Sequence, residues 1–125
     1  MTVRVLVVDD HEDWRNYIRL QFLMKPEWQI IGEVSDGLEA VKKAEELKPD
    51  LVLLDIGLPT INGIEAARRI RQVSPNSKIV FLSQEDAPDV VQAALSTGAQ
   101  GFVHKARAQS ELLPAIETAL RRDNL

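Results

Sequence analysis

Three carboxylates, one hydroxyl and one ammonium group follow apolar segments of this sequence that are expected to be strands. They belong to Asp9, Asp10, Asp55, Ser83 and Lys105. Two unit charges about 4 Å apart repel by roughly 4 kcal/mol at an effective dielectric constant of 20. Carboxylates that meet at one place therefore need a cation beside them, or one of them must hold a proton.

Lys105 can neutralise one of these charges, and the remaining charge indicates a bound metal ion. Oxygen ligands at a water-exposed edge suit Mg²⁺, which keeps several waters and accepts a phosphoryl oxygen. Zinc is disfavoured, because the chain has no cysteine and its two histidines, His11 and His104, follow different strands. A carboxylate between Mg²⁺ and a lysine can attack a phosphoryl group. Asp55 is the best nucleophile, since it ends a central strand.

Strand-like and helical segments alternate five times along the chain. The expected strands cover residues 3–8, 28–34, 51–54, 78–82 and 101–104. The expected helices cover residues 13–24, 38–47, 63–73, a segment between Asp86 and Gly98, and 110–122. Residues 51–54 are apolar at every position, which is typical of a central parallel strand covered on both faces.

This alternation predicts an α/β fold, a flavodoxin-like doubly wound (βα)5 domain with a five-stranded parallel sheet. The expected strand order is 2-1-3-4-5, which makes the first and third strands neighbours. In such sheets ligands bind beyond the carboxyl ends of the strands, where the strand order reverses. Asp9, Asp10, Asp55, Ser83 and Lys105 are therefore expected to meet at one edge of the sheet.

Polar residues and prolines mark the expected helix ends. Asp36 can cap the second helix, and Asn62 with Gly63 opens the third. Asp86 is expected to cap the fourth helix, with Pro88 in its first turn. Ser110 is expected to cap the last helix, so that Pro114 would bend or fray its first turn.

The bulk composition indicates one soluble domain over residues 1–125, with no output domain in this chain. The formal net charge is −4, and the arginines near residues 68–71 and 121–122 are interpreted as solvated helix faces. Direct nucleic-acid binding is therefore not expected. No apolar run approaches the roughly 20 residues that span a membrane, and no signal peptide is recognised. With no cysteine, the expected location is the cytoplasm.

Over essentially its whole length, the sequence resembles the response-regulator receiver domains of two-component signalling, of the NarL/FixJ type. The matching stretches are VLVVDDHEDWR at 5–15, PDLVLLDIGLPTINGIE at 49–65, IVFLSQ at 79–84 and ALSTGAQGFVHK at 94–105. The DDH run followed by Arg15 favours that subfamily.

The resemblance implies a phosphorylation-dependent switch that is not an enzyme beyond its own phosphorylation and dephosphorylation. Asp55 would accept a phosphoryl group from a histidine kinase or phosphotransfer protein. Mg²⁺ would be bound by Asp9, Asp10, Asp55 and the backbone carbonyl of Gly57, with Asp10 and Asp55 as direct ligands. The resemblance also allows a homodimer that forms on phosphorylation.

Ser83 and Lys105 would contact the phosphoryl oxygens, and Phe102 matches the aromatic switch position of the family. Phosphorylation adds about −1.5 to −2 charge units and strong acceptor oxygens. Ser83 and Lys105 would move to satisfy them, Phe102 would fill the vacated space, and the surface around the fourth helix, fifth strand and fifth helix would change.

Three positions depart from the family pattern. Ala106 stands where many receivers have proline, which disfavours a cis peptide bond after Lys105. Gly57 has no side chain to guide or block water, and Glu85 lies two residues after Ser83. His11, His104, Trp14 and Trp28 are interpreted as structural residues.

Three other functions are alternatives for a domain of this fold. A flavodoxin-like electron carrier would need a Ser/Thr/Gly-rich phosphate loop, but residues 9–13 are DDHED and would repel a flavin phosphate. A phosphatase of the haloacid dehalogenase type would need a DxD spacing, which the adjacent pair Asp9 and Asp10 lacks. A module that only mediates protein contacts would not need the intact acidic pocket.

Overall fold

A computed structural model describes residues 2–121. The strands are β1 (Val3–Val8), β2 (Trp28–Val34), β3 (Leu51–Leu54), β4 (Lys78–Ser83) and β5 (Gly101–His104). The helices are α1 (Glu12–Phe22), α2 (Gly37–Leu47), α3 (Gly63–Val73), α4 (Pro88–Leu95) and α5 (Ala108–Arg121), with a short 3₁₀ turn, η1 (Lys105–Arg107), before α5. The predicted alternation of strand and helix is confirmed.

The strands form one parallel sheet in the order β2-β1-β3-β4-β5, as predicted. In register, Val8 of β1 lies opposite Leu54 of β3, and Ser83 of β4 lies opposite His104 of β5. The carboxyl ends of β1, β3, β4 and β5 therefore reach the same edge of the sheet. This edge is where the structure places the predicted site residues.

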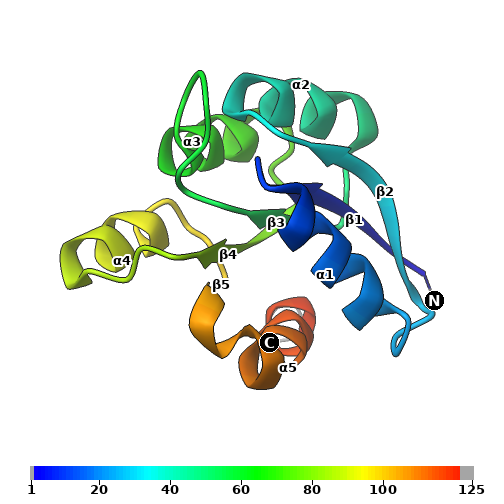
Figure 1. Ribbon diagram of the computed structural model, residues 1–125. Coiled ribbons are helices and arrows are strands. Elements are labelled where there is room, and N and C mark those ends of the chain that lie inside the picture. Colours follow the sequence, from blue (N-terminus) through cyan, green and yellow to red (C-terminus); the bar gives the residue numbers. More distant parts are fainter. Residues whose placement is uncertain (1, 122–125) are drawn as a thin grey trace.

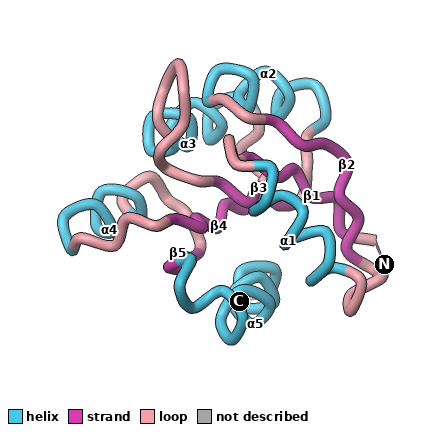
Figure 2. The backbone as a smooth tube through the Cα atoms, viewed as in Figure 1, coloured by secondary structure: helices cyan, strands magenta, loops and turns pink. Residues whose placement is uncertain are grey.

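Helices cover both faces of the sheet (Figure 1). On one face, α1 and α5 bury a core that includes Ile18, Leu112 and Ile116 against β1, β3 and β4. On the other face, α2, α3 and α4 bury a second core around Ile70 and Phe81. Figure 2 shows the same layers, with the connecting loops at the two ends of the strands. The apolar run of β3 is fully buried because both cores contact it.

Two predicted helix caps are confirmed. The side chain of Asp36 accepts a hydrogen bond from the Glu39 N–H, and that of Asn62 accepts one from the Glu65 N–H. The first helix runs from Glu12 to Phe22, slightly earlier than the predicted 13–24.

Two other predicted caps are wrong. Ala87, not Asp86, precedes α4, and no side chain caps this helix; Oδ2 of Asp86 lies 3.8 Å from Nε2 of His104. The turn η1 leads directly into α5, which begins at Ala108, so Ser110 lies inside the helix. Pro114 therefore lies beyond the first turn, and the helix continues through it to Arg121. The predicted end at residue 122 lies outside the described residues.

Among residues 2–121, no helix combines the length and the apolar character that a membrane crossing requires.

Candidate functional site

The carboxylates of Asp9 and Asp55 meet the ammonium group of Lys105 at the carboxyl edge of the sheet. Nζ of Lys105 lies 2.8 Å from Oδ2 of Asp9 and 3.2 Å from Oδ2 of Asp55. All three residues are at most 5% exposed. The predicted convergence of these side chains is therefore confirmed, although they are 46 and 50 residues apart in the sequence.

Parallel strand pairing places the two aspartates side by side. The Asp9 N–H donates to the carbonyl of Val34 in β2, and the Asp55 N–H donates to the carbonyl of Val8 in β1. Each aspartate is thus the first residue beyond its strand, and its backbone is still hydrogen-bonded to the neighbouring strand. Because both backbones are fixed, the two side chains are held at the same level of the sheet.

The loop after Asp55 turns back close to it, and a glycine makes this turn feasible. The Gly63 N–H donates to the carbonyl of Ile56 at 2.7 Å. A Cβ on Gly63 would lie 1.9 Å from the backbone oxygen of Asp55, closer than any side chain allows. In the same turn, the Ile56 N–H donates to Oδ1 of Asp55 at 2.7 Å, which fixes the carboxylate plane.

Burial raises the pKa of the Asp55 carboxyl above its ordinary value. The charge of Asp9 raises this pKa further, while Lys105 and the hydrogen bond from Ile56 oppose the rise without cancelling it. The site thus holds two buried carboxylates and one buried ammonium group. Its charge is incompletely balanced, and a further cation would favour the ionised form of Asp55.

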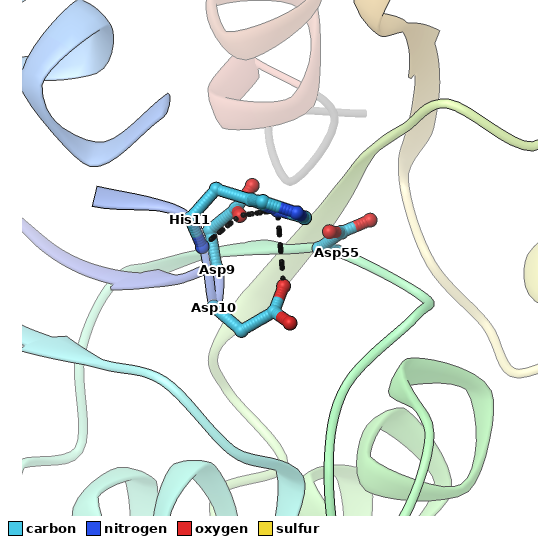
Figure 3. A group of neighbouring side chains, drawn as sticks. All are labelled: Asp9, Asp10, His11 and Asp55. Carbon is cyan, nitrogen blue, oxygen red and sulfur yellow. Dashed lines mark hydrogen bonds and ion pairs between the residues drawn. The ribbon is translucent and has the colours of Figure 1, made fainter. Parts of the chain in front are cut away.

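Asp10 and His11, which are exposed, extend the buried carboxylates of Asp9 and Asp55 into an acidic cluster. Nδ1 of His11 lies 3.2 Å from Oδ1 of Asp9 and 3.1 Å from Oδ1 of Asp10, and Figure 3 shows the imidazole beside both carboxylates. One ligand atom from each of Asp9, Asp10, His11 and Asp55 lies within 4.8 Å of the others. This cluster could bind a metal ion. His11, which the sequence indicates only as a structural residue, immediately precedes α1 and contacts the cluster.

Arg15 and Trp14, on the first turns of α1, reach the site from the side. The guanidinium of Arg15 donates to the backbone carbonyl of Asp9 at 2.6 Å and to Oε1 of Glu12 at 2.7 Å. Nζ of Lys105 lies 4.9 Å from the centroid of the Trp14 ring. The sequence indicates Arg15 only as a residue typical of the subfamily and Trp14 only as a structural residue. Neither the contact of Arg15 with the Asp9 carbonyl nor that of Trp14 with Lys105 could be predicted from the spacing of neighbouring residues in the sequence.

Ser83 ends β4 and is buried, and its Oγ accepts a hydrogen bond from the Glu85 N–H at 3.1 Å. Phe102 lies half-buried on β5, with its ring centroid 6.1 Å from that of Phe81. It lines a hollow together with Val91 and Leu95 of α4 and Glu111 of α5.

Gly57, whose carbonyl was predicted to bind metal, lies exposed two residues after Asp55, and a Cβ there would contact nothing within 4 Å. His104 is not part of the acidic cluster, and its Nε2 lies 2.9 Å from the carbonyl of Gln84. The peptide bond between Lys105 and Ala106 is trans.

The model of the response regulator receiver domain family matches residues 5–117 of the chain. The nitrate/nitrite response regulator protein NarL of Escherichia coli (strain K12) is 35% identical over 115 residues, which are 92% of this chain and 53% of NarL. The chemotaxis protein CheY of Thermotoga maritima is 37% identical, over 93% of this chain and 96% of CheY.

A solved structure of similar fold is the two-component response regulator of the LuxR family from Aurantimonas sp. SI85-9A1. It is 34% identical, with a TM-score of 0.91 over 98% of this chain and 87% of that chain. The chain spans about half the length of several curated relatives that it matches, NarL among them. These similarities leave the electron-carrier and phosphatase alternatives without support.

Proposed function

The chain belongs to the response regulator receiver domain family, and from this premise we propose that it is a phosphorylation-dependent signalling switch. The phosphoryl group would come from a histidine kinase or phosphotransfer protein and would be accepted by Asp55. The observation that carries the proposal is the contact of one buried ammonium group, that of Lys105, with the two buried carboxylates of Asp9 and Asp55.

In the proposed transfer, a carboxylate oxygen of Asp55 attacks the phosphorus of a phosphohistidine. A phosphorus–oxygen bond forms, the phosphorus–nitrogen bond breaks, and the imidazole nitrogen keeps the electron pair. Lys105 would offset the charge on the transferring oxygens, and the Ile56 N–H would keep the carboxylate in a fixed plane. Burial raises the pKa of Asp55, so a cation beside it would keep the nucleophile ionised.

The donor set fits Mg²⁺. Asp9, Asp10 and Asp55 offer oxygen atoms within 4.8 Å of one another, and a hard divalent cation prefers such ligands. We assign Asp10 and Asp55 as direct ligands, with Asp9 and the carbonyl of Gly57 completing the site. When bound, Mg²⁺ would neutralise carboxylate charge and polarise the phosphoryl oxygens.

Ser83 and Phe102 would convert the modification into a change of surface. The Ser83 hydroxyl oxygen now accepts from the Glu85 N–H, so binding a phosphoryl oxygen would require the hydroxyl group to turn. Phe102 borders the hollow between α4 and α5, which gives its ring space to move inward or outward. The affected surface is that of α4, β5 and α5.

The relatives are signalling proteins, and we propose that this chain catalyses no reaction besides its own phosphorylation and dephosphorylation. We treat residues 1–125 as one receiver domain that acts in the cytoplasm, does not itself bind nucleic acid and can pair with a second copy when phosphorylated. The activity of a longer regulator would depend on a domain outside this sequence.

The test is intact mass after incubation with acetyl phosphate. The wild-type protein should gain one phosphoryl group with Mg²⁺ and little with EDTA, and Asp55→Asn should gain none. Asp89→Asn makes the same chemical change at an exposed position of α4 and should behave as wild type. Equal gain by the wild type and Asp55→Asn would remove Asp55 from the assigned role.

A further inference from the structure

The ammonium group of Lys105 has a third neighbour besides its two carboxylates. It lies over the indole ring of Trp14, with Nζ 4.9 Å from the ring centroid. Only 3% of the Lys105 side chain is exposed, so water contributes little to holding the charge. Lysine has a flexible four-carbon stem, and the position of its ammonium group is therefore set by these contacts.

The indole ring is itself held in place by helix α1. The backbone N–H of Trp14 donates to the carbonyl of His11 at the start of the helix, at 3.1 Å, which fixes the Cα from which the ring projects. One turn later, the ring of Tyr17 packs edge-on against Trp14, with centroids 5.2 Å apart and an interplanar angle of 70°. Trp14 thus presents a fixed ring face to the lysine.

The face of an aromatic ring carries partial negative charge and attracts a cation within about 6 Å of its centroid, most strongly for tryptophan. The attraction is larger where water is excluded, as it is around Lys105. The ring and the two carboxylates are all in contact with the ammonium group. If the ring were lost, the lysine would keep its ion pairs but would sample more positions.

We propose that Trp14 is a positioning residue for phosphoryl transfer, because its ring face holds the Lys105 ammonium group at the Asp55 carboxylate. This role rests on the proposed function. It acts through Lys105, which must meet the transferring oxygens in a defined place, since misplaced charge stabilises the transition state less.

A purely structural role would depend on the volume of the Trp14 side chain, whereas a positioning role depends on the electrons of the ring. Fluorine atoms withdraw ring electrons with little change of shape. The chain has two tryptophans, Trp14 and Trp28, and Trp28 is a core residue at the start of β2, far from the carboxyl edge of the sheet. Trp28→Phe therefore leaves Trp14 as the single fluorinated position.

The experiment measures the rate of Asp55 phosphorylation by acetyl phosphate with Mg²⁺ in the Trp28→Phe protein. Position 14 carries tryptophan or its mono-, di- or trifluorinated form. The rate should fall stepwise, by about three- to tenfold across the series. The matched control is Trp14→Phe with the same fluorinated residues at position 28, where the rate should not change with fluorination.

A rate that stays flat or rises across the series overturns the positioning role. The contact itself is checked without phosphorylation, because the Trp14 ring should shift the proton resonances of the Lys105 ε-methylene group. Trp14→Leu should abolish this shift, and its persistence would also overturn the inference. A wild-type protein that gains no phosphoryl group overturns both proposals, whereas a flat series in a phosphorylated protein overturns only the role of Trp14.

Discussion

Replacing Asp55 by asparagine is expected to stabilise the folded protein near neutral pH when no divalent cation is present. The attraction between Asp55 and Lys105 at 3.2 Å is about 5 kcal/mol at an effective dielectric constant of 20. The ligand atom of Asp9 lies within 4.8 Å of that of Asp55, and their repulsion is about 3.5 kcal/mol or more. Burial of the ionised Asp55 carboxylate, the largest cause of its raised pKa, costs roughly several kcal/mol more. The variant therefore loses about 5 kcal/mol of attraction and relieves a somewhat larger sum, a net gain on the order of 2 kcal/mol.

The gain in stability of Asp55→Asn should grow as the pH rises. Burial raises the pKa of Asp55 in the folded state, from about 3.9 in the unfolded chain. The folded protein thus binds this proton more tightly than the unfolded chain does. The destabilising effect of the Asp55 charge is absent below the unfolded pKa, grows with rising pH, and is complete above the folded pKa. The advantage of Asp55→Asn should therefore vanish below about pH 4.

The assay is thermal unfolding by circular dichroism in EDTA, from acid to neutral pH. At roughly 4 °C per kcal/mol, Asp55→Asn should raise the Tm by about 8 °C near pH 7. Asp89→Asn, which removes an exposed charge from the first turn of α4, should lower stability by at most about 1 kcal/mol near neutral pH. A lower Tm for Asp55→Asn at pH 7, or an equal gain below pH 4, would refute the reasoning.

Mg²⁺ at ten times its dissociation constant should raise the free energy of unfolding by about 1.4 kcal/mol. Asp10→Asn should remove most of this rise in calorimetric titration and unfolding, and an unchanged rise would exclude Asp10 as a ligand. Lys105→Met leaves two buried carboxylates without their cation and should cost about 3–5 kcal/mol in urea unfolding at pH 7, less below pH 4. A loss under about 1 kcal/mol would contradict this. Gly63→Ala should cost about 1–3 kcal/mol because its Cβ meets the Asp55 backbone, whereas Gly57→Ala should cost under about 0.5 kcal/mol. Equal losses in urea unfolding would show that the close approach at Gly63 is relieved elsewhere.

The convergence of Asp9, Asp55 and Lys105 could be predicted because it depends on topology rather than on side-chain detail. Each residue directly follows an apolar strand-like run, and parallel strands end at one edge of their sheet. The caps at Asp36 and Asn62 were predictable for a similar reason, since a cap depends on residues three positions apart. The cap assigned to Asp86 is wrong because α4 begins one residue later, after Ala87, and the cap assigned to Ser110 is wrong because the 3₁₀ turn η1 leads into α5 before it.

The sequence by itself determined the order of strands and helices, the fold class and the chemical identity of the groups at the carboxyl edge. Those properties follow from apolar periodicity and from short-range capping, which are local. Only the tertiary structure decided that the Trp14 ring lies beside Lys105, that Arg15 holds the Asp9 carbonyl, and that His11 lies against both aspartates. These contacts depend on how far α1 is rotated about its axis against the sheet. Periodicity fixes which face of a helix is buried, but packing alone sets that rotation and the side-chain rotamers.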